Sequence, residues 1–308
     1  MLKVVVSLGV LVTILVGVDL AQVFALLREM DWLPFVAALG LYLFGALVRA
    51  YRWGSLVWAL GVRVGGLRLV ELHFVGAFFG MFLPTGVGGD AIKMYELSRE
   101  DDNTSAAISS VLVDRFTGLF VLFAIASIAL LGGHNLVAQE IRLLIALVFG
   151  LSLTAVALVL QRTWMEGWGR RLGLDRLFTR IKMLRELYLS LHLYGPGALL
   201  RATGASAVWN LCLIFSYYLL GRAVGVELSL WYYFLFVPVI SILLLLPSVG
   251  GLGIREGTTV LLFRQVGIGD ARALALALAY VVIRLTEALI GACIYVLQAI
   301  YEARKKAS

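Results

Sequence analysis

The sequence predicts an all-α polytopic membrane protein with six full transmembrane helices and two opposed re-entrant broken hairpins, arranged as an inverted repeat. Of its 308 residues, 61% are hydrophobic and only 15% are charged, and the mean hydropathy is +0.96. Soluble domains contain about 45–50% apolar residues, so this composition excludes an ordinary soluble protein. Two similar strings rich in Pro and Gly, at 83–90 and 246–253, interrupt apolar stretches.

The six predicted crossings are the long apolar runs, several of which reach the roughly 20 residues that a helix needs to cross a bilayer. They lie at 3–18, 33–48, 106–131, 141–160, 198–221 and 272–299. The first run, with a lone Lys3, could be a secretory signal, but no clear small-x-small cleavage site follows it. We therefore expect it to stay as an uncleaved helix.

The segments 69–99 and 231–266 are each predicted to enter the membrane, break and return to the same side. Their apolar limbs are short, and proline and glycine prevent a continuous helix, so the freed backbone groups need polar partners. Two such breaks in matching positions are typical of a transporter-like binding site near the bilayer midplane. The break residues are Pro84, Gly86, Gly88, Gly89, Asp90, Pro247, Ser248, Gly250, Gly251 and Gly253.

Lysine and arginine gather in three regions that are therefore predicted to be cytoplasmic. These are the loop holding Arg49, Arg52, Arg63 and Arg68, the polar stretch 162–195 and the C-terminal tail. The first hairpin then enters from the cytoplasm, the second enters from outside, and both termini are cytoplasmic. Leucines at helical spacing in 162–195 predict an amphipathic linker lying on anionic lipid. We expect an inner (plasma) membrane location in a prokaryote.

The whole chain, 1–308, is predicted to form a single membrane domain with two halves. The first break is followed by Val113-Asp114-Arg115-Phe116-Thr117, and the second by Val282-Ile283-Arg284-Leu285-Thr286. Each half thus contains a full helix, a broken hairpin and a helix with an arginine, in opposite orientations. This pattern indicates an inverted repeat, with one copy at about 33–131 and the other at about 198–299.

Four ionisable residues within apolar helices are the sharpest candidates for a site: Asp114, Arg115, Arg284 and Glu287. A charge at the centre of a membrane helix costs about 2.5–3.5 kcal/mol and usually faces a polar cavity. Arg115 and Arg284 could bind an anion such as a lipid phosphate through forked hydrogen bonds. The alternative for Arg284 and Glu287 is an internal ion pair on one helix face.

Five further charged residues are secondary candidates for substrate contacts. Lys93, Arg255 and Glu256 follow the breaks and either line the site or lie at the interface, while Arg49 and Arg52 either anchor a helix end or gather anionic headgroups. Asp90 could cap the half-helix that follows it. His73 is expected to form a satisfied or interfacial pair with Glu71 rather than a proton relay. Asn210 is expected to join two helices by a hydrogen bond.

Signals for catalysis are weak. Cys212, Cys293 and the three histidines form no cluster with metal-ligand spacing, and no phosphate-binding Walker loop is present. We therefore predict no catalytic residue, no metal and no cofactor, and nothing in the sequence indicates nucleic-acid binding. Gly76 and Gly80 form a small-x-x-x-small pair that could mediate helix contact within or between subunits, and the oligomeric state stays open.

Three strings carry a resemblance to a known family: FLPTGVGGDAIK at 82–93, SVLVDRFTGL at 110–119 and LPSVGGLGIREG at 246–257. With them the chain resembles the flippase-like integral-membrane family named for the transmembrane region of lysylphosphatidylglycerol synthase. In the multiple peptide resistance factors of that family, the membrane region is joined to a soluble domain that aminoacylates phosphatidylglycerol. This sequence ends at Ser308, shortly after its last predicted span, so we expect a stand-alone member without the synthase domain.

The resemblance implies that the chain moves a lipid between leaflets. The expected substrate is an anionic phospholipid, an aminoacylated lipid or a polyprenyl-linked lipid. Two alternatives stay open. One is a membrane-embedded lipid headgroup transferase with Asp114, Glu256 or Glu287 as the base, and the other is a non-transporting partner subunit of a separately encoded synthase.

Overall fold

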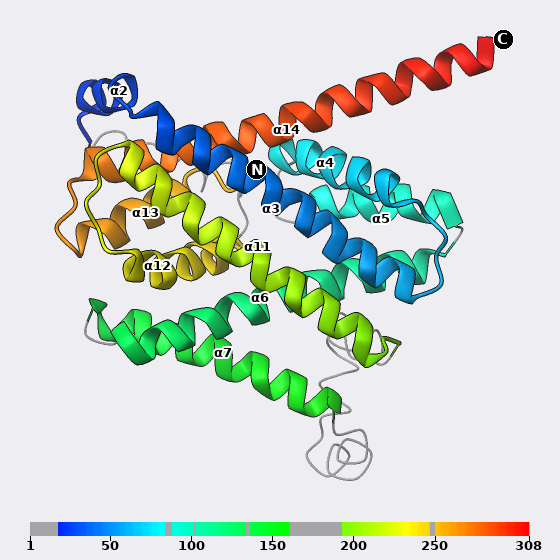
Figure 1. The fold of residues 1–308 in the computed structure, drawn as a ribbon, viewed down its shortest axis with the longest axis horizontal. Coiled ribbons are helices and arrows are strands. Elements are labelled where there is room, and N and C mark those ends of the chain that lie inside the picture. The colour runs from blue at the N-terminus through cyan, green and yellow to red at the C-terminus, as the bar shows by residue number, and fades with distance from the viewer. Residues whose placement is uncertain are drawn as a thin grey trace.

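The computed structural model describes residues 18–83, 88–101, 103–133, 136–160, 193–246 and 250–307, and within these ranges it contains ten α-helices and no β-strand. The first predicted crossing and nearly all of the predicted amphipathic linker lie outside the described residues, as do Pro84, Gly86, Pro247 and Ser248. Figure 1 shows the helices, which are α2 (Leu20–Arg28), α3 (Trp32–Ala59), α4 (Gly66–Phe82), α5 (Gly88–Asp101), α6 (Thr104–Gly133), α7 (Gln139–Leu160), α11 (Pro196–Ala223), α12 (Leu230–Leu243), α13 (Ile254–Arg264) and α14 (Asp270–Ala307).

Five of these helices, α3, α6, α7, α11 and α14, are long and apolar enough to cross a membrane. They coincide with the five predicted crossings that lie in the described ranges. Helix α3 is longer than predicted, because it continues to Ala59 instead of ending near 48. The prediction that Arg49 and Arg52 lie in a loop was therefore wrong. Both lie inside α3, where a carboxylate on α6 compensates the charge of Arg52.

Four shorter helices form two broken pairs, α4 with α5 and α12 with α13. At 1.5 Å per residue, even the 17 residues of α4 extend only about 25 Å, less than the hydrocarbon core of about 30 Å. Figure 1 shows the two pairs at opposite ends of the long helices, with their breaks directed toward the middle. There Gly250 meets the backbone of Met81, so that a Cβ on Gly250 would lie 2.5 Å from the Met81 carbonyl oxygen.

The limbs of the first pair pack closely because their contact consists of small residues. Gly89 at the start of α5 lies against Gly76 and Gly80 of α4, and a Cβ on Gly89 would overlap the carbonyl oxygen of Gly76. Small residues allow helix backbones to approach in this way. The predicted role of Gly76 and Gly80 in helix contact is thus realised within one chain.

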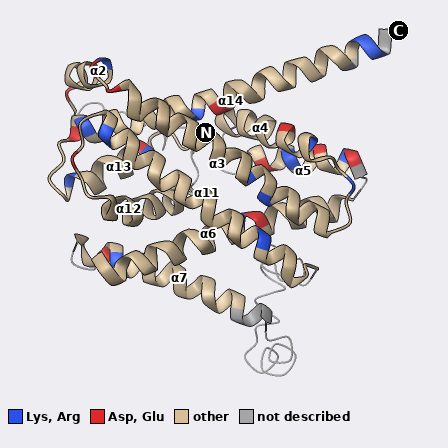
Figure 2. Ribbon diagram, viewed as in Figure 1, with Lys and Arg blue, Asp and Glu red and all other residues tan. Residues whose placement is uncertain are grey.

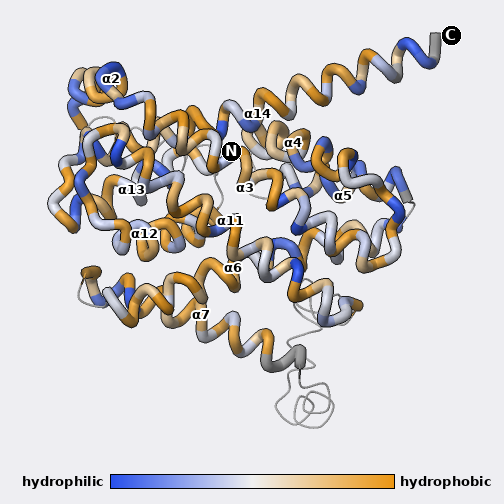
Figure 3. The backbone as a smooth tube through the Cα atoms, in the orientation of Figure 1, coloured by the Kyte–Doolittle hydropathy of each residue, from blue (hydrophilic) through white to orange (hydrophobic). Residues whose placement is uncertain are grey.

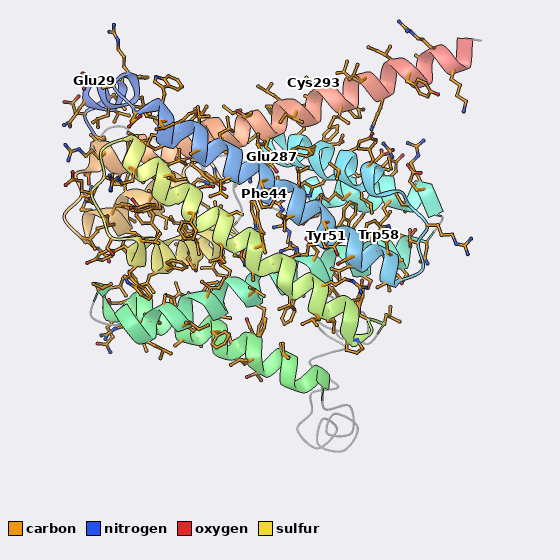
Figure 4. The ribbon with its side chains drawn as sticks, viewed as in Figure 1. Glu29, Phe44, Tyr51, Trp58, Glu287 and Cys293 are labelled. Atoms are coloured by element: carbon orange, nitrogen blue, oxygen red, sulfur yellow. The ribbon has the colours of Figure 1, made fainter. Side chains whose placement is uncertain are left out.

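The outer faces of the long helices are apolar, as the hydropathy colouring of Figure 3 shows. On α3, Phe44, Tyr51 and Trp58, labelled in Figure 4, are each more than 40% exposed. Large exposed apolar side chains are costly in water and ordinary in lipid. This surface, together with the five spans, is that of an integral membrane protein.

Helix α14 packs against α4 and α13. Its residues from Ala273 to Ala277 are fully buried, and small alanines alternate there with Leu274 and Leu276. Near the middle of α14, Gly291 lies so close to α4 that a Cβ would overlap the carbonyl oxygen of Phe74. Helix α14 joins the second half of the chain to the first broken pair. Its C-terminal part projects beyond the bundle in Figure 1.

Candidate functional site

A cavity of about 250 Å³ lies where the two broken pairs meet, between α3, α6, α11 and α14. Eight of the nine predicted substrate-binding residues line it, namely Arg49, Arg52, Lys93, Asp114, Arg115, Arg255, Arg284 and Glu287. Asp90 lines it as well. Among the described lining residues, six basic side chains therefore face three carboxylates. Figure 2 shows that most other charged residues lie toward the helix ends, so this is an unusual concentration of charge inside the bundle.

The breaks supply backbone to the cavity wall. Gly89 reaches it from the first break, and Gly250 and Gly251 reach it from the second. Gly250, Gly251 and Gly253 have φ values of 59°, 83° and 81°, in the left-handed region that favours glycine. Gly88 begins α5 and Gly253 precedes α13.

Arg52 and Asp114 form a buried, two-pronged ion pair between α3 and α6. Nε and Nη2 of Arg52 donate to the two carboxylate oxygens of Asp114 at 2.6 and 2.8 Å, and Nη1 donates to the hydroxyl of Ser206 at 3.2 Å. Only 5% of the Arg52 side chain and 11% of the Asp114 side chain are exposed. Both charges are thus already satisfied by each other.

Arg115 is engaged too, contrary to the expectation of a free anion-binding arginine. Its Nε donates to Oδ2 of Asp90 at 2.5 Å, and its side chain is 48% exposed. Asp90 is buried in the first turn of α5, and its carboxylate accepts from Arg115. Asp90 thereby links α5 to α6. Sequence spacing could not show that the residues pair, because they lie on different helices.

Arg255 and Arg284 are the lining arginines with open donors. The guanidinium of Arg255 lies 5.2 Å from the ring centroid of Tyr280, only 2% of the residue is exposed, and Nε and Nη1 have no hydrogen-bond partner among the described residues. Nε of Arg284 also lacks one there. Arg49 stacks on Trp209 at 5.0 Å. In the described part of the chain, no carboxylate lies within 4 Å of these three arginines, so none of them is held in a close ion pair there.

Glu287 does not pair with Arg284, so the alternative of an internal ion pair on α14 was wrong. Its Oε2 accepts from the hydroxyl of Tyr42 on α3 at 2.8 Å, and its Oε1 faces Nε2 of His73 on α4 at 3.7 Å. Figure 4 labels Glu287 on α14 close to α3 and α4. Oε1 of Glu287 and Nε2 of His73 are both buried without a hydrogen-bond partner in the described residues.

His73 is 1% exposed, and its Nδ1 lies 3.1 Å from Nζ of Lys93. The predicted pairing of His73 with Glu71 was wrong, because residues two apart on a helix point in different directions. Glu71 instead accepts from Arg68 and from Gln298 of α14. The sequence analysis did not predict this network, since neither Tyr42 nor His73 belongs to a motif.

Asn210 matches its prediction, because its side chain donates to the carbonyl of Gly118 at 3.1 Å.

Glu256 is the one predicted substrate-binding residue that does not line the cavity. Its Oε2 accepts from the backbone N–H of Gly253 at 2.6 Å, at the start of α13. A carboxylate in the first turn also complements the helix dipole. Glu256 therefore holds the second break in shape, and it is 1% exposed.

A second charged cluster joins α4 and α5 away from the cavity. Arg68 contacts Glu71, Glu96 and Glu100 at 3.3, 3.7 and 2.8 Å. Partial burial lowers the pKa of Arg68, but the hydrogen bonds to Glu100 and Glu71 outweigh this effect and raise the pKa above its ordinary value. This cluster closes the first broken pair at the end remote from its break. No metal-binding group of His, Cys, Asp or Glu occurs in the described residues.

Comparison with known proteins relates the chain to a curated membrane protein and to a protein family. A UPF0104 membrane protein from Pyrococcus horikoshii is 20% identical over 192 residues, which are 61% of this chain and 56% of that protein. The chain thus spans about half the length of this curated relative. Residues 1–291 match the family described as the lysylphosphatidylglycerol synthase TM region. The match covers nearly the whole chain, including both breaks and every residue of the cavity, and the chain belongs to this family.

Proposed function

We propose that the chain moves an anionic, phosphate-bearing lipid between the two leaflets of the membrane. The observation that carries this proposal is the cavity at the meeting point of the breaks, with Arg255 and Arg284, which form no ion pair with any described residue. Buried guanidinium N–H donors without a partner in the described residues, Nε and Nη1 of Arg255 and Nε of Arg284, favour an anion that accepts forked hydrogen bonds, which a phosphodiester does. A cavity of about 250 Å³ is small among ligand pockets and suits a headgroup, while the acyl chains stay in lipid.

The arrangement of the helices supports alternating access to this cavity. In the proposed topology, α4 and α5 form a re-entrant hairpin from the cytoplasm, and α12 and α13 form its inverted counterpart from outside. Six crossings, the first at 3–18, then place both termini in the cytoplasm of a prokaryotic inner membrane. Rocking of one repeat against the other around a fixed site is the mechanism of carriers built in this way.

We infer the contacts to the headgroup from the arginines of the cavity that form no close ion pair with a described carboxylate. Arg255 comes from the second break, Arg284 from the last helix, and Arg49 reaches the same cavity from α3. A phosphate between them would meet three helices that belong to both halves of the chain. The ion pairs Arg52–Asp114 and Arg115–Asp90 would then hold the walls in place and leave the central cations to the ligand.

One observation favours a second function, a transferase that acts on a lipid headgroup. Of the three proposed bases, Asp114 is bound twice by Arg52, and Glu256 is directed to the backbone of Gly253. Of these three, Glu287 is the one that both lines the cavity and keeps a carboxylate oxygen without a partner in the described residues. A transferase would therefore use Glu287 as its base. The flippase that we propose, by contrast, catalyses no chemical reaction.

The test of the flippase proposal is a leaflet-exchange assay with the purified full chain. Liposomes of phosphatidylcholine carry a trace of headgroup-anionic phosphatidylglycerol labelled with NBD on one acyl chain, and dithionite quenches the outer leaflet. We expect wild type and Arg99→Gln, an exposed change on α5, to give exchange, and Arg255→Gln/Arg284→Gln to abolish it. Exchange that persists unchanged in the double variant would refute the headgroup site. If wild type gives none, a transferase or a non-transporting partner subunit of a synthase becomes the better account.

A further inference from the structure

Lys93 is a buried amine. Its only hydrogen-bond partner in the described residues is an imidazole nitrogen of His73. It is 5% exposed, its Nζ lies 3.1 Å from Nδ1 of His73 and 5.3 Å from the ring centroid of Trp53, and no carboxylate lies within 4 Å in that part of the chain. It also lines the cavity. A charged ammonium buried without an anionic partner is costly, and lysine changes protonation readily in such places.

The geometry restricts how protons are placed in this pair. Two nitrogens at 3.1 Å need one proton between them, so Lys93 and His73 are not both fully protonated. With Lys93 charged, Nζ–H donates to Nδ1, and the neutral imidazole carries its own proton on Nε2, directed at Oε1 of Glu287. With Lys93 neutral, the pair has lost one positive charge. The contact is thus compatible with two states of the Lys93–His73 pair that differ by one proton.

The charges around the pair make its protonation depend on what the cavity holds. The charged groups that act on Lys93 and His73 come from α3, α5, α6 and α14, and are Arg49, Asp90, Asp114, Arg115 and Glu287. Asp90 and Asp114 are already tied to arginines. An empty cavity, with its excess of basic groups, therefore favours loss of the proton, and an anion in the cavity favours its return.

We propose that the Lys93–His73 pair is a proton-binding site that takes up one proton when an anionic headgroup enters the cavity. This inference rests on the proposed function. The proton from water binds the lone pair of the Lys93 amine, giving an ammonium that donates to His73, and its positive charge offsets the negative charge of the phosphodiester. Release of the headgroup on the other side returns the proton to water there. Lipid movement is then coupled to the proton gradient and adds no net charge to the membrane crossing.

Reciprocity gives the measurable consequence. If headgroup binding promotes protonation, protonation must promote headgroup binding by the same factor. The complex holds more protons than the free protein, so lipid affinity falls as pH rises from the range in which the free protein loses its proton to the higher range in which the complex loses it. A phosphodiester does not titrate near neutral pH, and the proton taken up must therefore come to the protein.

The experiment is calorimetric titration of the detergent-purified full chain with dihexanoylphosphatidylglycerol, repeated at several pH values in buffers of different ionisation enthalpy. The dependence of the heat on the buffer gives the protons taken up per lipid bound. We expect wild type and Arg99→Gln to reach a maximum of about one proton. Lys93→Arg keeps the charge but does not deprotonate, so we expect whatever lipid this variant binds to be bound without proton uptake.

The outcomes separate this inference from the proposed function. If wild type exchanges lipid in liposomes and binds the short-chain lipid without proton uptake, the proton site is refuted and the flippase stands. Uptake by Lys93→Arg equal to that of wild type also refutes it. If Lys93→Arg does not fold, the wild-type stoichiometry still decides. Absence of both lipid exchange and lipid binding in wild type overturns both proposals together.

Discussion

The guanidinium of Arg52 binds the carboxylate of Asp114 through two parallel hydrogen bonds of 2.6 and 2.8 Å, in the interior of a bundle with an apolar outer surface. Removing one partner of such a pair leaves a buried charge uncompensated, which costs about 3–5 kcal/mol, whereas replacing both by apolar groups is often neutral. The pair therefore joins α3 to α6 only as long as both members are present.

We accordingly predict that Arg52→Met lowers the thermal unfolding temperature of the detergent-purified protein strongly, and that Arg52→Met/Asp114→Leu recovers most of the loss. The measurement is intrinsic tryptophan fluorescence on heating. Arg99→Gln serves as a control for the loss of a cation at an exposed position, since 59% of its side chain is exposed. A double variant as unstable as the single one would show that the pair is not a self-contained unit.

Arg255 and Arg115 are predicted to differ in their effect on lipid retention. Arg255→Gln removes open donors from the cavity, and we expect about a tenfold or greater loss of anionic lipid affinity. Arg115→Gln combined with Asp90→Asn removes a satisfied pair and keeps the charge balance, so the loss should stay below about fivefold. Native mass spectrometry of copurified lipid compares the two. A larger loss from the paired change would make Arg115 the headgroup ligand instead.

Much of the site's membership could be predicted from sequence, because a charge or a Pro/Gly break inside an apolar stretch is too costly to occur without a local reason. That argument brought Lys93, Asp114, Arg255 and Arg284 into one hypothesis, and all four line the cavity. It could not assign partners. The pairs Arg52–Asp114 and Arg115–Asp90 join different helices, and their choice depends on helix rotation, which a single sequence does not specify.

The fold could be predicted to a similar degree. Spans are set by the length of apolar runs, so five helices were located, but α3 was ended too early at its first arginine. The aromatic residues that line the cavity could not be identified from the sequence, for a related reason. Tyr42 and Tyr280 are buried while Tyr51 and Tyr295 are exposed, and in a membrane protein both environments are apolar and give the same sequence signal.

Contact between the two breaks can be tested by a matched pair of glycine substitutions. Gly250 and Gly267 both have positive φ, 59° and 82°, so alanine costs about 1–2 kcal/mol of backbone strain at each. Only at Gly250 would the new Cβ also meet a neighbour, the carbonyl of Met81, since nothing lies within 4 Å at Gly267. We predict that Gly250→Ala lowers lipid exchange well below Gly267→Ala in the liposome assay. Equal exchange rates would mean that the contact has no part in transport.

The close approach of α14 to α4 makes a separate prediction about stability. A Cβ at Gly291 would overlap the carbonyl oxygen of Phe74, and overpacking of this kind costs about 1–3 kcal/mol. At Gly40 on α3 nothing lies within 4 Å, and alanine there should stabilise the helix by about 0.5–1 kcal/mol. Thermal unfolding of Gly291→Ala and Gly40→Ala should therefore shift in opposite directions. A Gly291→Ala protein as stable as wild type would contradict the tight contact.

The opposed orientation of the broken pairs can be tested by finding the side of the membrane on which α5 and α13 end. If α5 returns to the cytoplasm and α13 returns outside, a cysteine at the end of each helix should be reached from opposite sides. In a Cys212→Ser/Cys293→Ser background, Arg99→Cys should react with an impermeant maleimide in inverted membrane vesicles, and Arg264→Cys in right-side-out vesicles. Arg304→Cys, near the C-terminus, should follow Arg99→Cys. Labelling of Arg99→Cys and Arg264→Cys from the same side would exclude the inverted repeat, because two hairpins related by a two-fold axis in the membrane plane must open to opposite faces.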